Sequence, residues 1–299
     1  MLAALPAGLV GWVSVHLSFD RLGTPVEVAV DRPAIDLAGW KTSARAGEAR
    51  GQVLMLHGSS RYGAGLPLYR LLSRALSQAG FEVFAFDFRG YGRSDDPPSF
   101  SFTDYDFRRD IEAVVATLGW QRFHLVGHSL GASVAMSYLA QTRDPRVQSI
   151  VGIGPTRRAF DRALRPNAPD FEYMRRRLGR DMGLGRPVPA DLTRRILRIL
   201  NIDDTRGYFQ SQDHCPLLLL DGGTENPEDL VYLESFYRSI AEPKRYVTIR
   251  NADHYANTQS LFTRWIPRPG KAWDLVWVSD PAVLRNEERE ILGWIDTFN

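Results

Sequence analysis

The sequence predicts an α/β protein with a mostly parallel, doubly wound sheet covered by helices on both faces. Three observations lead to this prediction. Apolar segments alternate with helix-like segments from Val53 to Gly154, and the alternation resumes at Leu217. The apolar segments are nearly continuous, which is typical of strands buried on both faces. Between these two parts, residues 155–212 break the rhythm with arginine-rich helical patterns.

The chain ahead of this alternation is predicted to form an N-terminal arm (1–24) and an antiparallel hairpin. The hairpin strands are the β-rich runs at 26–30 and 35–41, separated by a turn at 31–33. The arm is apolar, but no Lys or Arg precedes its apolar run, so it lacks the n-region of a signal peptide. We expect a packed amphipathic segment, with weak membrane association through this arm as the alternative.

The core is predicted to comprise residues 25–154 and 213–299. Its first part should contain strands at 53–58, 81–88, 122–127 and 147–154, with helices at 68–79, 103–118 and 132–140. Its second part should contain strands at 217–223 and 245–249, with helices around 227–240 and 284–298. Strands that alternate with helices in this way form a parallel sheet flanked by helices.

Residues 155–212 are predicted to form a helical cap inserted after the sixth strand. Helical patterns at 171–178 and 192–200 are joined by a segment rich in Pro and Gly. The arginines of this region could recognise an acidic substrate, but a solvated helix face is the preferred interpretation. They are Arg157, Arg158, Arg175, Arg176, Arg177, Arg194 and Arg195.

Composition limits the classes of partner and cofactor. A net charge of +2 gives no reason to expect a nucleic-acid partner. Of the 37 basic residues 34 are Arg, which we attribute to a GC-rich, bacterial coding genome. The single cysteine, Cys215, excludes an internal disulfide and a thiolate metal cluster. No metal or cofactor motif is found, we expect a cytoplasmic location or else a membrane-associated one, and the oligomeric state stays open.

The string Gly127-His128-Ser129-Leu130-Gly131 is the most informative motif. It lies between an apolar strand-like run and a helix-like stretch, so it marks a sharp turn from strand to helix. Such a turn forces its central residue into a strained backbone conformation and lifts the hydroxyl of Ser129 above the sheet. Glycines on both sides remove side chains that would collide. This arrangement is typical of the nucleophile elbow of a serine hydrolase.

Three further motifs complete a resemblance to the α/β-hydrolase superfamily, in particular to its serine esterases and lipases. They are His57-Gly58-Ser59-Ser60 after the third strand, Asp87 to Ser94 (D-x-R-G-x-G-x-S) after the fourth, and Asn251-Ala252-Asp253-His254 after what we take as the last strand. The resemblance covers most of the chain and leaves out the cap and the arm. It implies an α/β-hydrolase fold with a helical cap insertion.

The resemblance also implies roles for the motif residues. The backbone N–H groups of Leu130 and Ser59 would form the oxyanion hole, and His57 would brace that loop. The Asp87 to Ser94 segment is interpreted as structural, with Asp87 and Arg89 pairing or binding backbone groups. His254 would be the general base. His16, His124, His128 and His214 are interpreted as structural.

The acid of the triad is less well defined by the sequence. The family often has G-x-x-D after the preceding strand, and residues 222–225 place Glu225 at that acid, with Glu instead of Asp. Asp221 and Asp229 are the alternatives, and any of the three could instead cap the helix that begins near Pro227. The preferred order Ser129, Glu225, His254 matches the nucleophile, acid, base order of the fold.

The predicted activity is hydrolysis of a small-molecule carboxylic ester through an acyl-enzyme. A serine at the elbow argues against dehalogenase or epoxide hydrolase chemistry, which uses a carboxylate there in similar proteins. Thioesterase, amidase, carbon–carbon hydrolase and perhydrolase activities stay open, because they differ in pocket detail rather than in the triad. The alternative from another class is a ligand receptor that keeps the fold and an idle triad.

Overall fold

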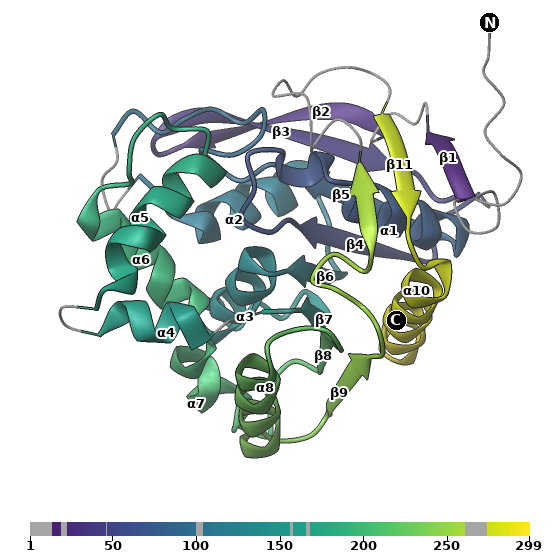
Figure 1. The fold of residues 1–299 in the computed structure, drawn as a ribbon. Coiled ribbons are helices and arrows are strands. Elements are labelled where there is room, and N and C mark those ends of the chain that lie inside the picture. Colours follow the sequence, from purple (N-terminus) through teal and green to yellow (C-terminus); the bar gives the residue numbers. More distant parts are fainter. Residues whose placement is uncertain are drawn as a thin grey trace, which may run out of the picture.

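The structure is a computed structural model, and it describes residues 14–18, 23–45, 47–99, 104–155, 158–165, 168–260 and 274–299. One large sheet runs through the molecule with helices on both faces, and a small sheet lies at one side (Figure 1). This arrangement confirms the α/β class and the mostly parallel sheet.

The large sheet has eight strands in the order β2-β3-β5-β4-β6-β7-β8-β9. Its strands are β2 (Thr24–Asp31), β3 (Ala34–Thr42), β4 (Gly51–Leu56), β5 (Phe81–Phe86), β6 (Phe123–His128), β7 (Val147–Ile153), β8 (Leu217–Gly222) and β9 (Lys244–Ile249). β2 and β3 form the predicted hairpin, with Asp31 opposite Ala34, and β3 also runs antiparallel to β5. The strands from β4 to β9 are parallel, so their carboxyl ends share one edge of the sheet.

Alternate side chains of each strand feed two separate hydrophobic cores. On one face Val53 and Met55 pack with α1 (Pro67–Gln78) and α10 (Pro281–Thr297). On the other face Leu54 and Leu56 belong to a core that also contains residues of α2 (Phe107–Leu118), α3 (Leu130–Thr142) and α8 (Pro227–Ser239). Because both faces are covered, the strands are apolar at nearly every position, as the continuous apolar runs predicted.

Residues 158–209, which we call the inserted segment, connect β7 to β8 through several short helices. These are α4 (Arg158–Leu164), α5 (Asp170–Asp181), α6 (Ala190–Leu200), the 3-10 helix η2 (Ile202–Thr205) and α7 (Arg206–Phe209). Of these, α6 and η2 pack against α3, whereas α4 contacts α8 (Figure 1). Met174, Ile196 and Leu197 belong to the same hydrophobic core as α3. The two predicted helical patterns correspond to α5 and α6.

A second sheet, of three antiparallel strands, was not predicted. It has the order β1-β11-β10 and consists of β1 (Ser14–Ser18), β11 (Asp274–Val278) and β10 (Thr258–Ser260). The prediction that His254 follows the last strand was therefore wrong, because β10 and β11 come after it. These strands are short, and the partners β1 and β11 lie at opposite ends of the chain, so a local pattern does not reveal their pairing.

The arm contains β1, so part of it is a strand of this small sheet. Its residues 1–13 and 19–22 lie outside the described residues, and the expected membrane association is therefore a matter of sequence alone. Within the described ranges, no helix combines the length and the apolar character needed to cross a membrane.

Candidate active site

Ser129 occupies the turn between β6 and α3 in a strained conformation, with φ 53° and ψ −115°. This region of the backbone map is rarely occupied by a residue with a side chain. The turn is held by a hydrogen bond of 2.8 Å from the N–H of Ser129 to the carbonyl oxygen of Ile153. A Cβ at Gly127 would lie 2.5 Å from the carbonyl carbon of Gly131. The glycine there is a steric requirement of the turn, as the motif predicted.

His254 and Glu225 are brought together by the loops after β9 and β8. Nδ1 of His254 lies 2.7 Å from Oε1 of Glu225, and the two side chains are 12% and 9% exposed. The two loops are joined by their main chains, because the N–H of Thr224 donates to the carbonyl oxygen of Ala252 at 3.0 Å. The carboxylate therefore holds one ring nitrogen of His254 in a fixed orientation.

Gly154 places this pair next to the elbow. It directly follows Ile153, whose carbonyl oxygen holds Ser129, and it has a φ of +51°. A Cβ on Gly154 would lie 2.9 Å from Cε1 and 3.0 Å from Nδ1 of His254. The imidazole of His254 thus packs against the residue after β7, beside the turn that carries Ser129.

The alternative acids have other positions. Asp221 is buried at the end of β8, and its carboxylate accepts the N–H of Gly222 at 3.1 Å. Asp229 is buried in the first turn of α8. The cap of α8 is Asn226, whose side chain accepts the N–H of Glu228 at 2.9 Å. The suggestion that one of the three acids caps this helix was wrong, because an amide oxygen from Asn226 satisfies the same N–H group.

The loop after β4 passes directly against Ser129. A Cβ on Gly58 would lie 3.1 Å from Cβ of Ser129. The N–H of Gly58 donates to the hydroxyl of Tyr69 in α1 at 2.6 Å, so it points into the protein. The hydroxyl of Ser59 donates to Asp181 at the end of α5 at 3.0 Å. The inserted segment therefore contacts the loop that the sequence assigned to the oxyanion hole.

His57 is structural, as expected. Its Nε2 accepts the N–H of Phe88 at 2.9 Å, and its Nδ1 lies 2.6 Å from the carbonyl oxygen of Gly58. Burial lowers the pKa of His57 to about 4. The ring is therefore neutral at pH 7, both nitrogens are engaged by the backbone, and it braces the loop.

The other described histidines also contact groups of the fold. His124 lies 2.8 Å from the hydroxyl of Ser149, and burial lowers its pKa to about 4. Nδ1 of His214 lies 2.7 Å from the carbonyl oxygen of Cys215. His128 contacts both Tyr69 and the backbone of His254. The side chain of His16 lies outside the described residues.

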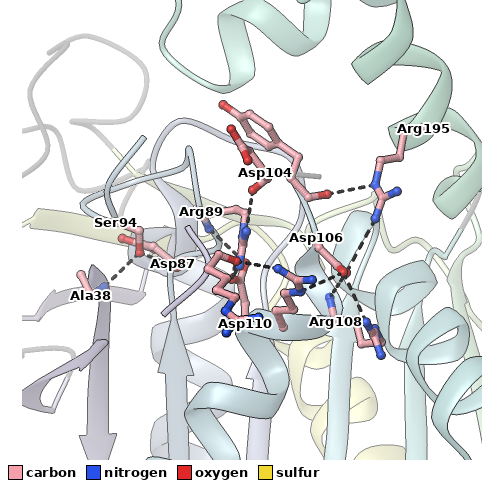
Figure 2. A network of polar contacts seen from close by, with 12 residues as sticks. Ala38, Asp87, Arg89, Ser94, Asp104, Asp106, Arg108, Asp110 and Arg195 are labelled. Atoms are coloured by element: carbon pink, nitrogen blue, oxygen red, sulfur yellow. Dashed lines mark hydrogen bonds and ion pairs between the residues drawn. The ribbon is translucent and has the colours of Figure 1, made fainter. Parts of the chain in front are cut away.

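The Asp87 to Ser94 segment anchors the loops near the site (Figure 2). Asp87 accepts the N–H groups of Ala64 at 2.6 Å and Arg93 at 2.8 Å, and burial raises its pKa to about 7. Arg89 pairs with Asp110 at 2.6 Å, where both side chains are fully buried. Asp87 thus binds backbone groups and Arg89 pairs with a different acid, which supports the structural interpretation.

Arg195 departs from the preferred interpretation of the cap arginines as a solvated face. It extends from α6 to the loop before α2, where it donates to the carbonyl oxygen of Tyr105 at 3.1 Å and lies 3.7 Å from Asp106 (Figure 2). Its side chain is 18% exposed. Arg195 therefore docks the inserted segment onto the core. Arg157 and the side chain of Arg158 lie outside the described residues.

Within the part of the chain that the structure describes, no group of three or more His, Cys, Asp or Glu side chains has an arrangement that could hold a metal ion. Cys215 is buried, and burial raises the pKa of its thiol to about 12.

Known structures share this fold. A thermophilic esterase from Thermogutta terrifontis has a TM-score of 0.58 and 19% identity, over 92% of this chain and 98% of the esterase. A monoglyceride lipase from Saccharomyces cerevisiae has a TM-score of 0.60 and 17% identity, over 89% of this chain and 92% of the lipase. The family profile described as the alpha/beta hydrolase fold matches residues 52–181. The chain therefore has the α/β-hydrolase fold.

Curated relatives match over shorter stretches. The putative carbamate hydrolase RutD of Variovorax paradoxus is 35% identical over 35% of this chain and 38% of its own length. The lysophosphatidylserine lipase ABHD12 of Xenopus tropicalis is 36% identical over 64% of this chain and 47% of its own length. The chain thus spans about two fifths to one half of these relatives, which are named for different reactions.

Proposed function

We propose that this protein is a serine hydrolase that cleaves carboxylic esters through an acyl-enzyme intermediate. The observation that carries the proposal is the contact of 2.7 Å between His254 and Glu225, beside a strained Ser129. A serine hydroxyl is a weak nucleophile until an imidazole accepts its proton, and the imidazole needs a carboxylate to fix its tautomer. Gly154 packs against His254 and directly follows Ile153, whose carbonyl oxygen holds Ser129, so His254 and Ser129 lie at the same edge of the sheet.

We assign a role to each ring nitrogen of His254. Glu225 accepts a hydrogen bond from Nδ1, so Nε2 keeps the lone pair that takes the proton of Ser129. Ser129 then attacks the ester carbonyl, and His254 returns the proton to the alcohol as it leaves. Water attacks the acyl-enzyme in the second half of the reaction, again with His254 as base.

We assign the oxyanion hole to the backbone N–H groups of Leu130 and Ser59. Leu130 is the first residue of α3, so its N–H belongs to the positive end of a helix. The N–H of Gly58 is engaged by Tyr69, which favours Ser59 as the donor from this loop. Two donors aimed at the developing negative charge typically contribute most of the rate enhancement in acyl transfer.

Esters are the substrate class that the structural neighbours favour. Both solved structures described above are named for ester cleavage, by an esterase and a monoglyceride lipase. The carbamate hydrolase relative is a reason to test carbon–nitrogen bonds as well. We propose a small-molecule ester rather than a nucleic acid as the partner. We also propose that the inserted segment acts as a cap, because Asp181 of α5 contacts Ser59.

The test is Ser129→Ala, with Ser137→Ala on the same α3 helix as the control. Ser129→Ala should lower turnover of a short p-nitrophenyl ester by roughly 10⁴-fold and abolish labelling by a fluorophosphonate. Residual turnover within tenfold of wild type would contradict the assignment of the nucleophile. A panel of short esters, long esters, thioesters and amides separates the activities that share this triad, and a receptor would show no catalytic turnover on any of them.

A further inference from the structure

A chain of three hydrogen bonds, of which two are buried and the third is partly buried, runs from the loop after β4 to the loop after β9. The N–H of Gly58 donates to the hydroxyl oxygen of Tyr69 at 2.6 Å. That oxygen lies 2.7 Å from Nδ1 of His128, and Nε2 of His128 lies 2.7 Å from the carbonyl oxygen of His254. Tyr69 and His128 are 1% and 2% exposed, so bulk water does not compete for the two contacts of the Tyr69 hydroxyl.

The direction of each bond follows from the atoms that carry hydrogen. A backbone N–H is a donor, so the oxygen of Tyr69 accepts from Gly58, and its single hydrogen points to His128. Nδ1 of His128 is therefore an acceptor, and Nε2 carries the hydrogen that the carbonyl of His254 accepts. Burial raises the pKa of Tyr69 well above its usual range, so the hydroxyl keeps its proton. The contact with His254 thus requires a hydrogen on Nε2 of His128, because a carbonyl oxygen can only accept.

The chain ends at two groups that the mechanism needs. Gly58 precedes Ser59 and contacts the nucleophile, since a Cβ on Gly58 would lie 3.1 Å from Cβ of Ser129. At the other end His128 holds the main chain of His254, and the two imidazole rings have centroids 4.6 Å apart. The hydrogen-bonded chain therefore spans the distance between the oxyanion loop and the base.

We propose that Tyr69 and His128 are positioning residues that fix the oxyanion loop and His254 relative to each other. The proposal rests on the proposed function. Neither side chain meets the substrate in this role, because both are buried and act through Gly58 and His254. A displacement of about 1 Å in a catalytic group typically costs on the order of 100-fold in rate, so a small loosening of this chain is measurable.

Tyr69→Phe is the direct test because it removes a single oxygen atom. It should lower kcat by roughly 10-fold to 100-fold while KM changes by less than about threefold. Labelling by a fluorophosphonate should slow by a similar factor, because that reaction uses the same base and oxyanion hole. The acidic limb of the kcat/KM profile reports the state of the base and should move to lower pH when His254 is held less firmly.

Tyr138→Phe in α3 is the matched control. The Tyr138 hydroxyl is also buried, and it donates a hydrogen bond of 2.5 Å to Asp144. This bond lies away from the candidate site. Tyr69→Phe removes two hydrogen bonds of a buried hydroxyl and Tyr138→Phe removes one, so both melting temperatures should fall, while only Tyr69→Phe should lose activity. If the two variants lose activity equally at equal loss of stability, the Tyr69 hydroxyl only stabilises the fold and the proposal is overturned.

A double-mutant cycle tests whether the two residues act as one chain. Tyr69→Phe, His128→Phe and the double variant should give non-additive losses, with the double variant within about threefold of the slower single variant. Multiplicative losses would show independent roles and overturn the proposal. A wild-type protein that neither turns over esters nor reacts with the fluorophosphonate would instead refute the proposed function, and this is established before any variant is compared.

Discussion

The loops at the carboxyl ends of β6 to β9 and the inserted segment are held together in different ways. In the strand-end loops (residues 129–131, 154, 222–225 and 251–257), contacts join main chain to main chain, such as Ser129 to Ile153 and Thr224 to Ala252. In the inserted segment, contacts between charged or aromatic side chains add to main-chain contacts such as that from the N–H of Val188 to the carbonyl oxygen of Arg175. Examples of the side-chain contacts are Arg175 with Glu172 at 2.8 Å and Arg194 over the ring of Phe171 at 5.0 Å.

This difference teaches where the protein tolerates change. A main-chain contact leaves no space for added atoms, and a Cβ on Gly222 would lie 2.7 Å from the carbonyl oxygen of Ala252. Partly exposed ion pairs contribute only about 0–1 kcal/mol each, so one such pair substitutes for another at little cost. We therefore expect large effects at the strand ends and small effects in the inserted segment.

The largest expected effect is at the acid. Glu225→Gln should lower kcat/KM by roughly 10³-fold to 10⁴-fold, because the amide no longer fixes the tautomer of His254 or stabilises its cation. Asp221→Asn and Asp229→Asn, measured in the same ester assay, should fall by less than about tenfold. A greater loss in Asp221→Asn or Asp229→Asn than in Glu225→Gln would show that the sequence alignment of the acid is displaced by a few residues.

Two glycines with left-handed backbones give a matched comparison of the two regions. Gly154 (φ +51°) contacts His254, whereas Gly183 (φ +72°), in the inserted segment, has no atom within 4 Å of an added Cβ. Gly154→Ala should lower kcat by roughly 100-fold because it displaces the base. Gly183→Ala should cost about 1 kcal/mol of stability and leave kcat unchanged. Equal activity in both variants would show that the close packing of Gly154 against His254 does not position the imidazole.

A buried carboxyl beneath the strand-end loops gives a pH-dependent prediction. Glu287 of α10 is 3% exposed, and Oε1 has no hydrogen-bond partner among the described residues. It lines a small cavity together with Asp221, Glu225, Asp253 and His254. Burial, with smaller contributions from Glu288 and Asp253, raises its pKa from 4.5 to about 8. The folded state therefore holds this proton more tightly than the unfolded state.

The sign of the effect follows from linkage. A carboxyl with a raised pKa contributes no penalty below pH 4.5, and it destabilises the fold increasingly as the pH rises from 4.5 to about 8. Glu287→Gln should remove this penalty and stabilise the protein at pH 8 by up to roughly 3–5 kcal/mol, at about 1.4 kcal/mol per unit of pKa. Denaturant unfolding at pH 5 and pH 8 measures the difference. Glu290→Gln, which breaks an ion pair with Arg245, should show no such pH dependence.

The smallest effects are expected among the arginines of the inserted segment. Arg195→Gln removes the contact that docks α6 onto the core and should cost about 1 kcal/mol of unfolding free energy. Arg194→Gln removes a pair with Asp191 at 3.2 Å between exposed side chains and should cost less than about 0.5 kcal/mol. Chemical denaturation of both variants checks the order. A larger loss of unfolding free energy in Arg194→Gln than in Arg195→Gln would contradict the distinction between an arginine that docks α6 onto the core and an exposed one.

The sequence predicted the features that depend on local backbone geometry. Gly127 and Gly131 mark a turn that permits no side chains there, and the apolar runs mark strands covered on both faces. The contact between Glu225 and His254 was also predictable, because parallel strands bring their carboxyl ends to one edge of the sheet. The chemical roles of these residues stay a proposal.

The features that the sequence did not reveal depend on partners far apart in the chain. Tyr69 lies in an amphipathic helix and looks like any core aromatic residue, although its hydroxyl connects Gly58 to His128. Arg195 resembles the exposed arginines around it, because only the loop before α2 distinguishes it. β1 and β11 pair from opposite ends of the chain. Tyr69 could have been identified from its place on the buried face of its helix, because a buried hydroxyl needs a hydrogen-bond partner.

The backbone of Ser129 carries a further consequence. A residue with a side chain at φ 53° and ψ −115° is strained, and the surrounding turn enforces that conformation whatever the side chain does. Glycine adopts such angles without this cost, so the free energy of unfolding of Ser129→Gly should exceed that of Ser129→Ala by about 1 kcal/mol. The side chain at position 129 would then lower the stability of this turn relative to glycine. Under the function that we propose, the turn keeps a side chain for its chemistry at a cost in stability.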